Sequence, residues 1–596
     1  MPYLCNMRNN KLKTIIAAMA CIALQAQGQT AIKLNENTTY QNIDNWAASD
    51  CWTAEFVGRY FSQTNKEKVA KWLFSTRMDA NGNPTGIGLS SWRVNLGAGS
   101  AAQGDNSAIE DETRRVDCFL QADGTYDWSR CPGQQYFMKA AKDYGVNDFV
   151  LFSNSAPVHY TKNGIAHCDK TTGSANLKED CYDDFAEFLA TTAKHFTDEG
   201  YNISFISPVN EPSWDWQDNS QEGSHWTNAT IAKLARELNT SITSRNLNTK
   251  MLIPEAVAYT TLSGLFSENQ LNAFWGSTSS NYLGNLPSLA PIVAAHSYWT
   301  FGTNYELEHA RTSARDAAAK YGVKIYQTEW SLLDNAPSKN TGFPEGGYDA
   351  ATRTDIALFM AKVIQCDMIY ANAASWSYWT AMDREQWGQK DRFHLIRVNA
   401  YGDTGYESYG SLTTNGTVYD DMTLWALGNF SLFVRPGYKR IDMTGADEIN
   451  GLLGSTYLSP DGKKLAIVIV NTGSNERSIT LTADGRDLNG YKINTYITDA
   501  YHRLRRNLTL APTYDGGNLT ITARSVTTIT LEMPEDPTIV GDVNNDGKVD
   551  VADINCIINV ILENEPASNY DGRADVNGDS KVDVADINLV IDIILQ

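Results

Sequence analysis

Residues 203–216 read ISFISPVNEPSWDW, a short apolar run that stops at Pro208 and is followed by Asn210 and Glu211. Apolar runs of four to eight residues are typical of buried strands. Barrel enzymes carry their catalytic groups at the C-terminal ends of such strands. The position of Glu211 therefore predicts that it is a catalytic acid.

A second carboxylate stands in the same setting. Residues 324–331, KIYQTEWS, lead a β-favouring stretch into the isolated Glu329. Hydrolysis of a glycosidic bond needs one protonated carboxyl, which donates to the leaving oxygen, and one ionised carboxylate on the other side of the sugar. Glu211 and Glu329 supply these two groups.

Five motifs together resemble glycoside hydrolase family 30. They are SPVNEPSWDW (207–216), YQTEWS (326–331), SSWRVNLGAGS (90–100), SNSAPVHYTKNG (153–164) and AAHSYW (294–299), and EGSHW (222–226) is most like the endo-β-1,6-galactanase branch. The resemblance covers residues 42–531. It implies a retaining (β/α)8 enzyme with the acid/base after barrel strand four and the nucleophile after strand seven.

The pattern along the chain predicts an α/β fold with a (β/α)8 TIM barrel over residues 42–428. Short apolar stretches alternate with amphipathic helical stretches, as in parallel βα units. The expected strands are 42–48, 88–96, 148–152, 203–209, 250–254, 292–297, 324–328 and 373–378. The expected helices are 66–74, 135–143, 181–198, 227–245, 306–321 and 353–367.

In this register, three polar side chains are expected around the two glutamates. Arg93, just inside strand two, would favour the ionised form of Glu329; the alternative is a structural ion pair beneath the barrel rim. Asn210 would donate to the sugar 2-hydroxyl. The resemblance implies that Tyr298 donates a hydrogen bond to the nucleophile.

Other residues near the strand ends are candidates for sugar contacts. His296 is expected to line a subsite, although a histidine there is also compatible with a structural role. Aromatic side chains suit sugar stacking, and plain packing is the alternative. The aromatic candidates are Trp214 and Trp216 beside Glu211, and Trp376 and Trp379 after strand eight.

The two-carboxylate arrangement predicts double displacement with net retention. Carboxyl groups about 5 to 5.5 Å apart would fit this mechanism, whereas inversion needs about 6.5 to 9.5 Å. We expect no metal or other cofactor in the chemistry.

Residues 429–532 predict an antiparallel β-sandwich side domain. Short β-rich segments alternate with turns such as SPDGKK and NTGSN. The expected strands are 450–457, 465–471, 478–481, 492–498, 519–521 and 526–531. The resemblance implies that residues 29–41 add a strand to this domain, whose role is either support of the barrel, which we favour, or carbohydrate binding.

After a proline-rich acidic linker, residues 533–540, an internal repeat fills residues 541–596. Oxygen donors and one lysine carbonyl recur at positions 1, 3, 5, 7, 9 and 12 of two calcium loops, each followed by an apolar helix. They are Asp542, Asn544, Asp546, Lys548, Asp550 and Asp553, and then Asp575, Asn577, Asp579, Lys581, Asp583 and Asp586.

This small α-helical unit resembles a type I dockerin. The resemblance implies that it binds two Ca²⁺ ions and offers a cohesin-type protein as a possible partner. Position 6 is Gly547 in the first loop but Ser580 in the second, so Ser580 must accept a tight turn.

The N-terminus predicts export. Two lysines precede an apolar run too short to span a bilayer, which indicates a signal peptide over residues 1–28 and a secreted, periplasmic or cell-surface enzyme; lipidation at Cys21 is the alternative. In an oxidising compartment we expect the disulfides Cys118–Cys131 and Cys168–Cys181.

Composition narrows the partners. A net charge of −21 argues against nucleic acid or anionic lipid, and no other segment is long and apolar enough to cross a membrane. We expect a monomer that acts on a polysaccharide or oligosaccharide.

Three functions remain after this reading. The first is a retaining endo-hydrolase of β-1,6-galactan, such as the side chains of arabinogalactan. The second is the same mechanism on β-1,6-glucan, xylan or a glucosylceramide-like β-glycoside. The third is a non-catalytic carbohydrate-binding or scaffold protein, which the presence of Glu211, Glu329 and Arg93 disfavours.

Overall fold

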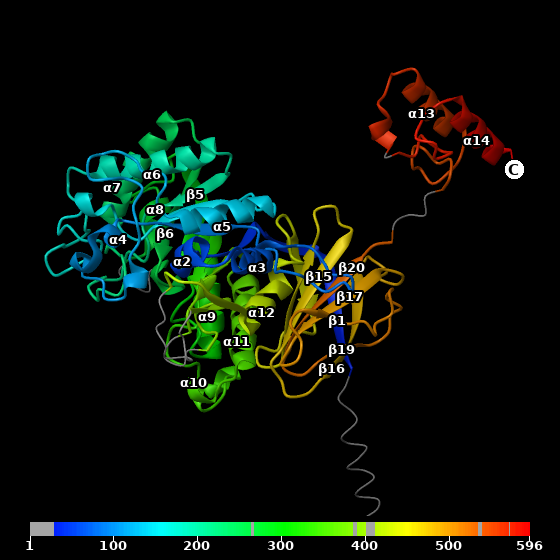
Figure 1. Ribbon diagram of the computed structural model, residues 1–596. Coiled ribbons are helices and arrows are strands. Elements are labelled where there is room, and N and C mark those ends of the chain that lie inside the picture. The colour runs from blue at the N-terminus through cyan, green and yellow to red at the C-terminus, as the bar shows by residue number, and fades with distance from the viewer. Residues whose placement is uncertain are drawn as a thin grey trace, which may run out of the picture. The chain divides into compact units, whose positions relative to one another are not determined.

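The computed structural model describes residues 29–263, 268–385, 390–400, 412–534, 539–570 and 572–595. The chain forms two compact units, Met1–Glu532 and Met533–Gln596 (Figure 1). The signal-peptide prediction and residues 535–538 of the predicted linker lie outside the described residues.

The first unit contains the predicted barrel. Its eight strands are parallel and follow the order β2-β9-β8-β7-β6-β5-β4-β3. The parallel bridge between Ser49 and Arg93 brings the two ends of this sheet together. The strands, each overlapping its predicted range, are β2 (Asn45–Ala48), β3 (Trp92–Leu96), β4 (Phe149–Ser153), β5 (Ile203–Ser207), β6 (Lys250–Ala256), β7 (Leu289–His296), β8 (Lys324–Trp330) and β9 (Ala373–Tyr378).

Helices surround this barrel (Figure 1) and cover the outer face of the strands. Strands covered on both faces are apolar along their whole length, which explains their continuous hydrophobic runs. The six predicted helices correspond to α3 (Gln63–Phe74), α5 (Pro132–Asp143), α6 (Tyr182–Asp198), α7 (Asn228–Ser244), α9 (Asn304–Ala319) and α11 (Arg353–Ile369). Additional helices are α2 (Thr53–Tyr60), α4 (Ser100–Gln103), α8 (Gln270–Trp275), α10 (Gly347–Ala350) and α12 (Met422–Ser431).

Helix α12 is not among the six helices expected from the sequence, and it extends past residue 428, the expected end of the barrel. All of its residues are buried, because the helix packs between α11 and strands of the side domain. A helix that is buried all round lacks the polar face on which amphipathic periodicity depends. A small sheet of β10 (Met382–Asp383), β11 (Ile396–Ala400) and β12 (Gly416–Asp420) precedes it.

The side domain is one curled nine-stranded sheet. Its order is β18-β17-β20-β15-β14-β13-β1-β16-β19, and one apolar face closes on itself to form a separate core. The strands are β1 (Thr30–Asn42), β13 (Lys439–Thr444), β14 (Leu452–Leu458), β15 (Lys464–Asn471), β16 (Arg477–Asp484), β17 (Lys492–Thr498), β18 (Arg505–Arg506), β19 (Leu519–Ile521) and β20 (Ser525–Glu532). The N-terminal strand β1 is present as predicted, but its pairing with β16 is parallel, an exception to the antiparallel expectation.

Strand β15 attaches this domain to the barrel. Leu465, Ile467 and Ile469 point into the core of the side domain, whereas Ala466 and Val468 belong to the barrel core. Because successive side chains of a strand alternate between faces, one strand serves both cores. This arrangement agrees with a supporting role for the side domain.

The predicted disulfides are wrong in this structure. Cys118, Cys131, Cys168 and Cys181 are all free thiols. The Cys168 sulfur accepts a hydrogen bond from the His225 backbone N–H (3.3 Å), and the Cys131 thiol donates to the Asp117 carbonyl (3.6 Å). The Cys131 and Cys168 sulfurs thus have hydrogen-bond partners other than the expected cysteines, which local spacing could not reveal.

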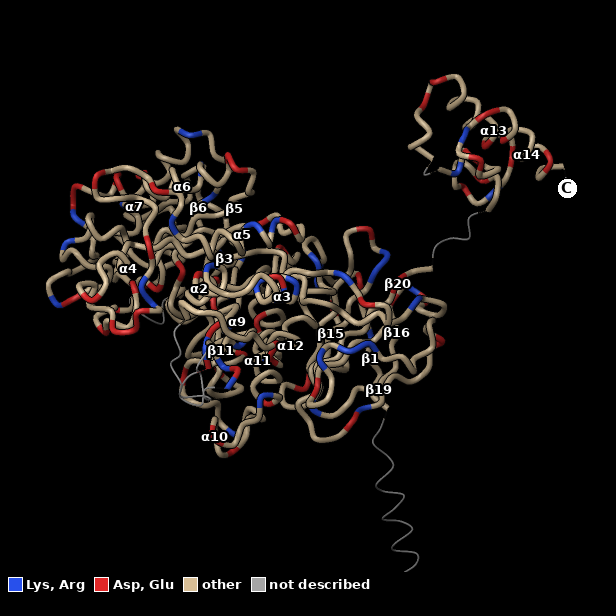
Figure 2. Tube along the Cα trace, viewed as in Figure 1, with Lys and Arg blue, Asp and Glu red and all other residues tan. Residues whose placement is uncertain are grey.

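The second unit contains the duplicated loop and helix. Helices α13 (Val551–Ile561) and α14 (Val584–Ile594) each follow an acidic loop and pack together around Val543, Ile557 and Val590. Figure 2 shows the acidic residues in this unit beside the two helices. In the described part of the chain, no helix is both long and apolar enough to cross a membrane.

Candidate active site and calcium loops

Glu211 lies just beyond the end of β5, where its backbone is held from both sides. Its N–H donates to the Glu255 carbonyl (2.9 Å), and its own carbonyl accepts from the Trp214 N–H (3.0 Å) and the Trp216 indole N–H (3.2 Å). Glu211 and Glu255 both have a positive φ, 43° and 56°. This conformation costs free energy in a residue with a side chain, so the backbone bond between the two glutamates helps to stabilise it.

Glu329 lies in β8, and both of its carboxylate oxygens are hydrogen-bonded. The Arg93 guanidinium donates to Oε2 (2.8 Å), and the Tyr298 hydroxyl donates to Oε1 (3.1 Å). Arg93 also donates to the Asn210 side-chain oxygen (3.0 Å). Arg93 and Tyr298 thus contact the Glu329 carboxylate, and Asn210 lies beside Arg93.

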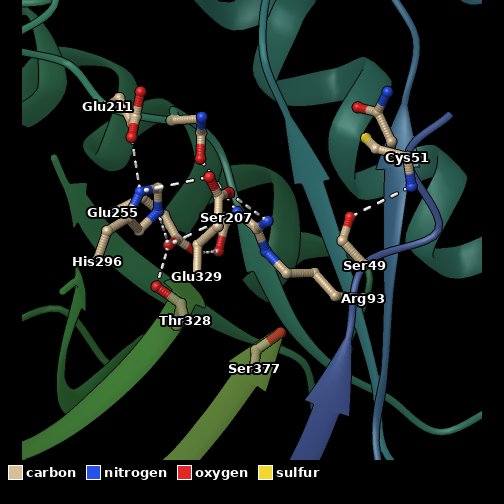
Figure 3. A network of polar contacts seen from close by, with 12 residues as sticks. Ser49, Cys51, Arg93, Ser207, Glu211, Glu255, His296, Thr328, Glu329 and Ser377 are labelled. Carbon is tan, nitrogen blue, oxygen red and sulfur yellow. Dashed lines mark hydrogen bonds and ion pairs between the residues drawn. The ribbon is translucent and has the colours of Figure 1, made fainter. Parts of the chain in front are cut away.

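His296, at the end of β7, connects all three carboxylates of the site (Figure 3). Its Nδ1 is 2.8 Å from Glu211 Oε1 and 3.7 Å from Glu329 Oε1, and its Nε2 is 3.3 Å from Glu255 Oε2. The side chain is 0% exposed. The expectation that His296 lines a sugar subsite is therefore wrong, because its ring is enclosed by carboxylates.

Glu255, in β6, is the residue that the sequence analysis missed. It is completely buried, accepts hydrogen bonds from Ser207 (2.6 Å) and Thr328, and lies 3.7 Å from Arg93. The signal was present: MLIPEA, residues 251–256, is another apolar run that ends in an isolated carboxylate. Its depth in the barrel distinguishes it from Glu211 and Glu329.

These contacts determine the electrostatics. Burial would lower the pKa of His296, but the Glu329, Glu211 and Glu255 carboxylates raise it to about 10. Burial would raise the pKa of Glu255, but Arg93 and His296 hold it at about 2. Burial raises the pKa of Glu329, and the positive charges of His296 and Arg93 oppose that rise.

Charge balance then indicates the protonation state of the site. Protonated His296 and Arg93 supply two positive charges against three carboxylates, Glu211, Glu255 and Glu329. A buried cluster with a net charge is costly. The cluster therefore carries one carboxylate more than its two cations, and Glu211 is the outermost of the three carboxylates.

The separation of the outer carboxylates can support covalent catalysis. One oxygen each of Glu211 and Glu329, together with a His296 nitrogen, lie within 4.8 Å of one another. An oxygen–oxygen separation of at most 4.8 Å is shorter than the about 6.5 to 9.5 Å that inverting glycosidases need. A sugar placed over the pair can meet a proton donor and a nucleophile.

Two exposed tryptophans flank Glu211. Trp214, three residues after Glu211, is 42% exposed, and Trp299, next to Tyr298, is 49% exposed. Their rings are stacked, with centroids 5.7 Å apart at an interplanar angle of 10°, and the Trp299 backbone N–H donates to the Asp334 carboxylate (2.6 Å). Trp299 was not predicted, and its proximity to Trp214 arises only from the fold.

The other predicted aromatic residues lie elsewhere. Trp376 is 0% exposed, and its indole N–H donates to Asp367 (2.8 Å), so it is a packing residue and not a sugar platform. Trp216 is likewise buried, with its indole hydrogen-bonded to the Glu211 backbone. Trp379 is buried and makes an edge contact with Trp52. Its ring centroid lies 6.0 Å from the Arg93 guanidinium.

Among the described residues, a second group could hold a metal ion: Asp391, His394 and Asp421. Arg353 already pairs with Asp391, and His394 pairs with Asp421 (2.9 Å). The other such group consists of Glu211, His296 and Glu329. In it, Arg93 pairs with Glu329, and His296 pairs with Glu211. In both groups, arginine and histidine side chains of the protein thus contact the carboxylates.

The acidic loops of the second unit fit calcium. In the first loop, Asp542 accepts hydrogen bonds from the backbone N–H groups of Asp546 (3.0 Å) and Gly547 (2.9 Å). In the second, Asp575 accepts from Asp579 (3.0 Å) and Ser580 (2.8 Å). The donor set consists of oxygens, as Ca²⁺ prefers, and the loops wrap their backbone around the first carboxylate.

The two loops end in the same way. Asp553 and Asp586 are buried, and each also accepts a hydrogen bond (2.9 Å) from the backbone N–H of the residue at position 9. Ser580 has a φ of 68°, close to the 84° of Gly547, which confirms that it adopts the tight turn. That turn costs more for serine than for glycine.

Comparison with protein families gives three matches. A model described as "O-Glycosyl hydrolase family 30" matches residues 29–391, and "Glycosyl hydrolase family 30 beta sandwich domain" matches residues 437–529. "Dockerin type I domain" matches residues 540–595.

Individual proteins are also similar. An endo-beta-1,6-galactanase of Hypocrea rufa is 24% identical over 390 residues, 62% of this chain and 71% of that protein. Glucuronoxylanase XynC of Bacillus subtilis (strain 168) is 24% identical over 367 residues, 60% of this chain and 68% of that protein. A solved structure of a conserved exported protein from Bacteroides fragilis is 30% identical with a TM-score of 0.75, covering 84% of this chain and 100% of that one.

The low pKa of Glu255 predicts a pH-dependent contribution to stability. A carboxyl whose folded pKa, about 2, lies below its usual value of 4.5 stabilises the fold fully above pH 4.5 and loses that effect as the pH falls through about 2. Glu255→Gln should therefore lower the free energy of unfolding by about 3 to 5 kcal/mol at pH 6, because it leaves Arg93 and His296 short of a partner.

Thermal unfolding between pH 2 and 7 measures this difference. The gap in melting temperature between wild type and Glu255→Gln should narrow steadily below pH 4.5. The exposed carboxylate variant Glu110→Gln should stay within a degree or two of wild type throughout. A gap that is the same at pH 2.5 and pH 6 would contradict the proposed ionisation of Glu255.

Proposed function

Because the chain belongs to O-glycosyl hydrolase family 30, we propose that it is a retaining endo-hydrolase of β-1,6-linked galactan, such as the side chains of arabinogalactan. The observation that carries this proposal is the buried network in which Glu211 and Glu329 approach within 4.8 Å around one histidine. The family supports the reaction class, and the similarity to an endo-beta-1,6-galactanase supports the sugar and linkage.

In the first step, Glu329 attacks the anomeric carbon while Glu211 gives its proton to the leaving glycosidic oxygen. The C–O bond of the substrate breaks, and a glycosyl-Glu329 ester forms. If His296 donates from Nδ1 to Glu211 Oε1, the acidic proton is directed to Oε2. His296 would therefore orient the acid as well as balance its charge.

In the second step, Glu211 is a carboxylate and takes a proton from water. The water oxygen attacks the anomeric carbon, the bond to Glu329 breaks, and the product retains its configuration. The hydrogen bonds from Arg93 and Tyr298 stabilise the Glu329 carboxylate that this step releases. Asn210, whose oxygen is held by Arg93, can direct its N–H₂ group to the sugar 2-hydroxyl.

The stacked pair of Trp214 and Trp299 supports a subsite for the leaving sugar. Both rings lie beside Glu211, the group that we assign to protonate the leaving oxygen. Exposed aromatic faces in a fixed plane suit the C–H faces of sugar rings. The endo action that we propose rests on the similarity to an endo-beta-1,6-galactanase.

The rest of the chain supports an exported enzyme. We propose that residues 1–28 are a signal peptide, that the second unit binds two Ca²⁺ ions, and that it attaches the monomeric enzyme to a cohesin-type partner. The proposed calcium ligands are the twelve loop residues named above.

Replacing Glu211 and replacing Glu329 should give azide products of opposite anomeric configuration. With β-1,6-galactan, Glu211→Ala and Glu329→Gly should each lower kcat by at least about 100-fold, because each step needs both groups. With an aryl β-galactoside and azide, Glu211→Ala should form the β-galactosyl azide and Glu329→Gly the α-azide. Proton NMR distinguishes the two products.

The wild type should be assayed on β-1,6-galactan, β-1,6-glucan and glucuronoxylan, with chromatography of the products. The exposed helix residue variant Glu308→Gln is the matched control and should keep full activity. Cleavage of a different polymer would replace the substrate and keep the mechanism. A folded wild-type protein that cleaves none of them would refute the proposal.

Trp299→Ala should weaken binding of the leaving sugar. One lost stacking contact of about 0.5 to 1.5 kcal/mol predicts a roughly two- to tenfold lower kcat/KM on galactan. Turnover of β-galactosyl fluoride, which has no leaving sugar, should be unchanged. Trp299→Phe should recover most of the loss, and Tyr305→Ala, at an exposed aromatic residue of α9, should behave as wild type. Equal losses on both substrates would argue against this role.

Calcium removal should unfold the second unit alone. With a chelator, calorimetry should lose one small transition while galactan hydrolysis persists, because the acidic loops need the cation to offset their charge. Titration of the chelated protein should find two sites, and Ser580→Gly should tighten the weaker one by relieving the positive φ. An unfolding profile that does not respond to the chelator would contradict calcium-dependent folding.

A further inference from the structure

The mouth of the barrel contains a cavity apart from the catalytic carboxylates. Its volume is about 260 Å³, and it lies between α2, α4 and the start of α5. Trp52, Phe56 and Tyr60 supply its aromatic surface, Asn95 and Glu112 supply polar groups, and Ala101 lies on its rim. No contact in the proposed mechanism uses this cavity.

The cavity lies beside the junction of β2 and β3, where the barrel sheet closes. Strands β2 and β3 are joined through the bridge of Ser49 and Arg93, and beyond it the Asp50 side chain accepts from the Asn95 N–H (2.9 Å). Asn95 is two residues beyond Arg93 on β3, so its side chain is on the same face and about 7 Å nearer the barrel mouth. One wall of the cavity, at Asn95, is therefore two residues along β3 from the arginine that contacts Glu329.

One buried group in the cavity lacks a partner. Asn95 is 2% exposed, and its side-chain N–H₂ has no hydrogen-bond acceptor among the described residues. A buried donor without an acceptor costs about 1 to 3 kcal/mol. A ligand hydroxyl in the cavity would supply the acceptor.

The lining also indicates the class of ligand. Three aromatic rings suit the C–H faces of a sugar, and carboxylate and amide groups suit its hydroxyls. The guanidinium groups of Arg59 and Arg115 are balanced by the carboxylates of Glu112 and Asp117, and burial raises the pKa of Glu55 to about 7. The lining therefore has no excess positive charge to attract a uronate, which favours a neutral sugar.

The position of the cavity determines which part of the chain it would meet. Trp214 and Trp299 follow β5 and β7, whereas the cavity is at β2 and β3, across the ring of eight strands. The leaving sugar is on the tryptophan side. The opposite side therefore faces the sugars that precede the cleaved bond.

We infer that this cavity is a distal subsite for a neutral sugar on the non-reducing side of the cleaved bond. The inference rests on the proposed function and extends it, because a chain held at both sides of the mouth spans the catalytic pair. The Trp52 ring, in edge contact with Trp379 at 5.1 Å, separates this subsite from Arg93.

Filling the cavity from its rim tests the inference. Ala101 is exposed on the short helix α4, so Ala101→Trp adds a ring to the cavity without removing a buried contact. The kcat/KM on galactan and on β-1,6-galactotetraose should fall about tenfold. Turnover of β-galactosyl fluoride, which occupies only the catalytic position, should not change.

Ala102→Trp is the matched control. Ala102 is equally exposed on the same helix and does not line the cavity, so this variant should match wild type on every substrate. Phe56→Ala, which removes an aromatic wall instead of filling the space, should also weaken turnover of the tetraose and spare the fluoride. This second variant covers the case in which Ala101→Trp disturbs the fold and slows both substrates.

The outcomes separate the two proposals. Equal activity of Ala101→Trp and Ala102→Trp on the tetraose, in an active enzyme, would overturn the subsite and leave the proposed function intact. A wild type that prefers another polymer would be tested with oligomers of that polymer, with the same expectation. A wild type that hydrolyses no substrate would overturn both.

Discussion

The structure of the barrel depends on one buried cluster of charges. Arg93, Glu211, Glu255, His296 and Glu329 come from five different strands or strand ends, and each is almost completely buried. An unpaired charge in this position would destabilise the fold by several kcal/mol. The strands must therefore meet in one register for the charges to pair, and the same register creates the catalytic geometry.

Within the cluster, depth assigns different tasks to chemically identical groups. Glu255 is enclosed by hydroxyl groups and cations, so it stays ionised and keeps His296 protonated. Glu211 has fewer donors and is the most exposed of the three carboxylates. The positive φ of Glu211 and of Glu255 is the conformational cost of aiming both side chains inward.

Around the cluster, aromatic side chains form two groups at the mouth of the barrel. The stacked Trp214 and Trp299 are exposed beside the acid, and Trp52 and Trp379 are packed above Arg93. Large exposed rings are unfavourable in water, so a platform of this kind indicates a ligand surface. In the proposed function, an extended sugar chain passes between these two aromatic groups and over the two outer carboxylates.

The sequence by itself determined the features that depend on neighbours along the chain. The eight strands, the six amphipathic helices, Glu211 and Glu329 at strand ends, and the two acidic loops follow from local periodicity and spacing. Only the tertiary structure decided the features that depend on distance in space: the burial of Trp376, the role of Glu255, the free cysteines, the fully buried α12 and the stacking of Trp214 on Trp299. The physical reason is that burial and pairing of side chains are set by strands far apart in the sequence, whose contacts no local pattern records.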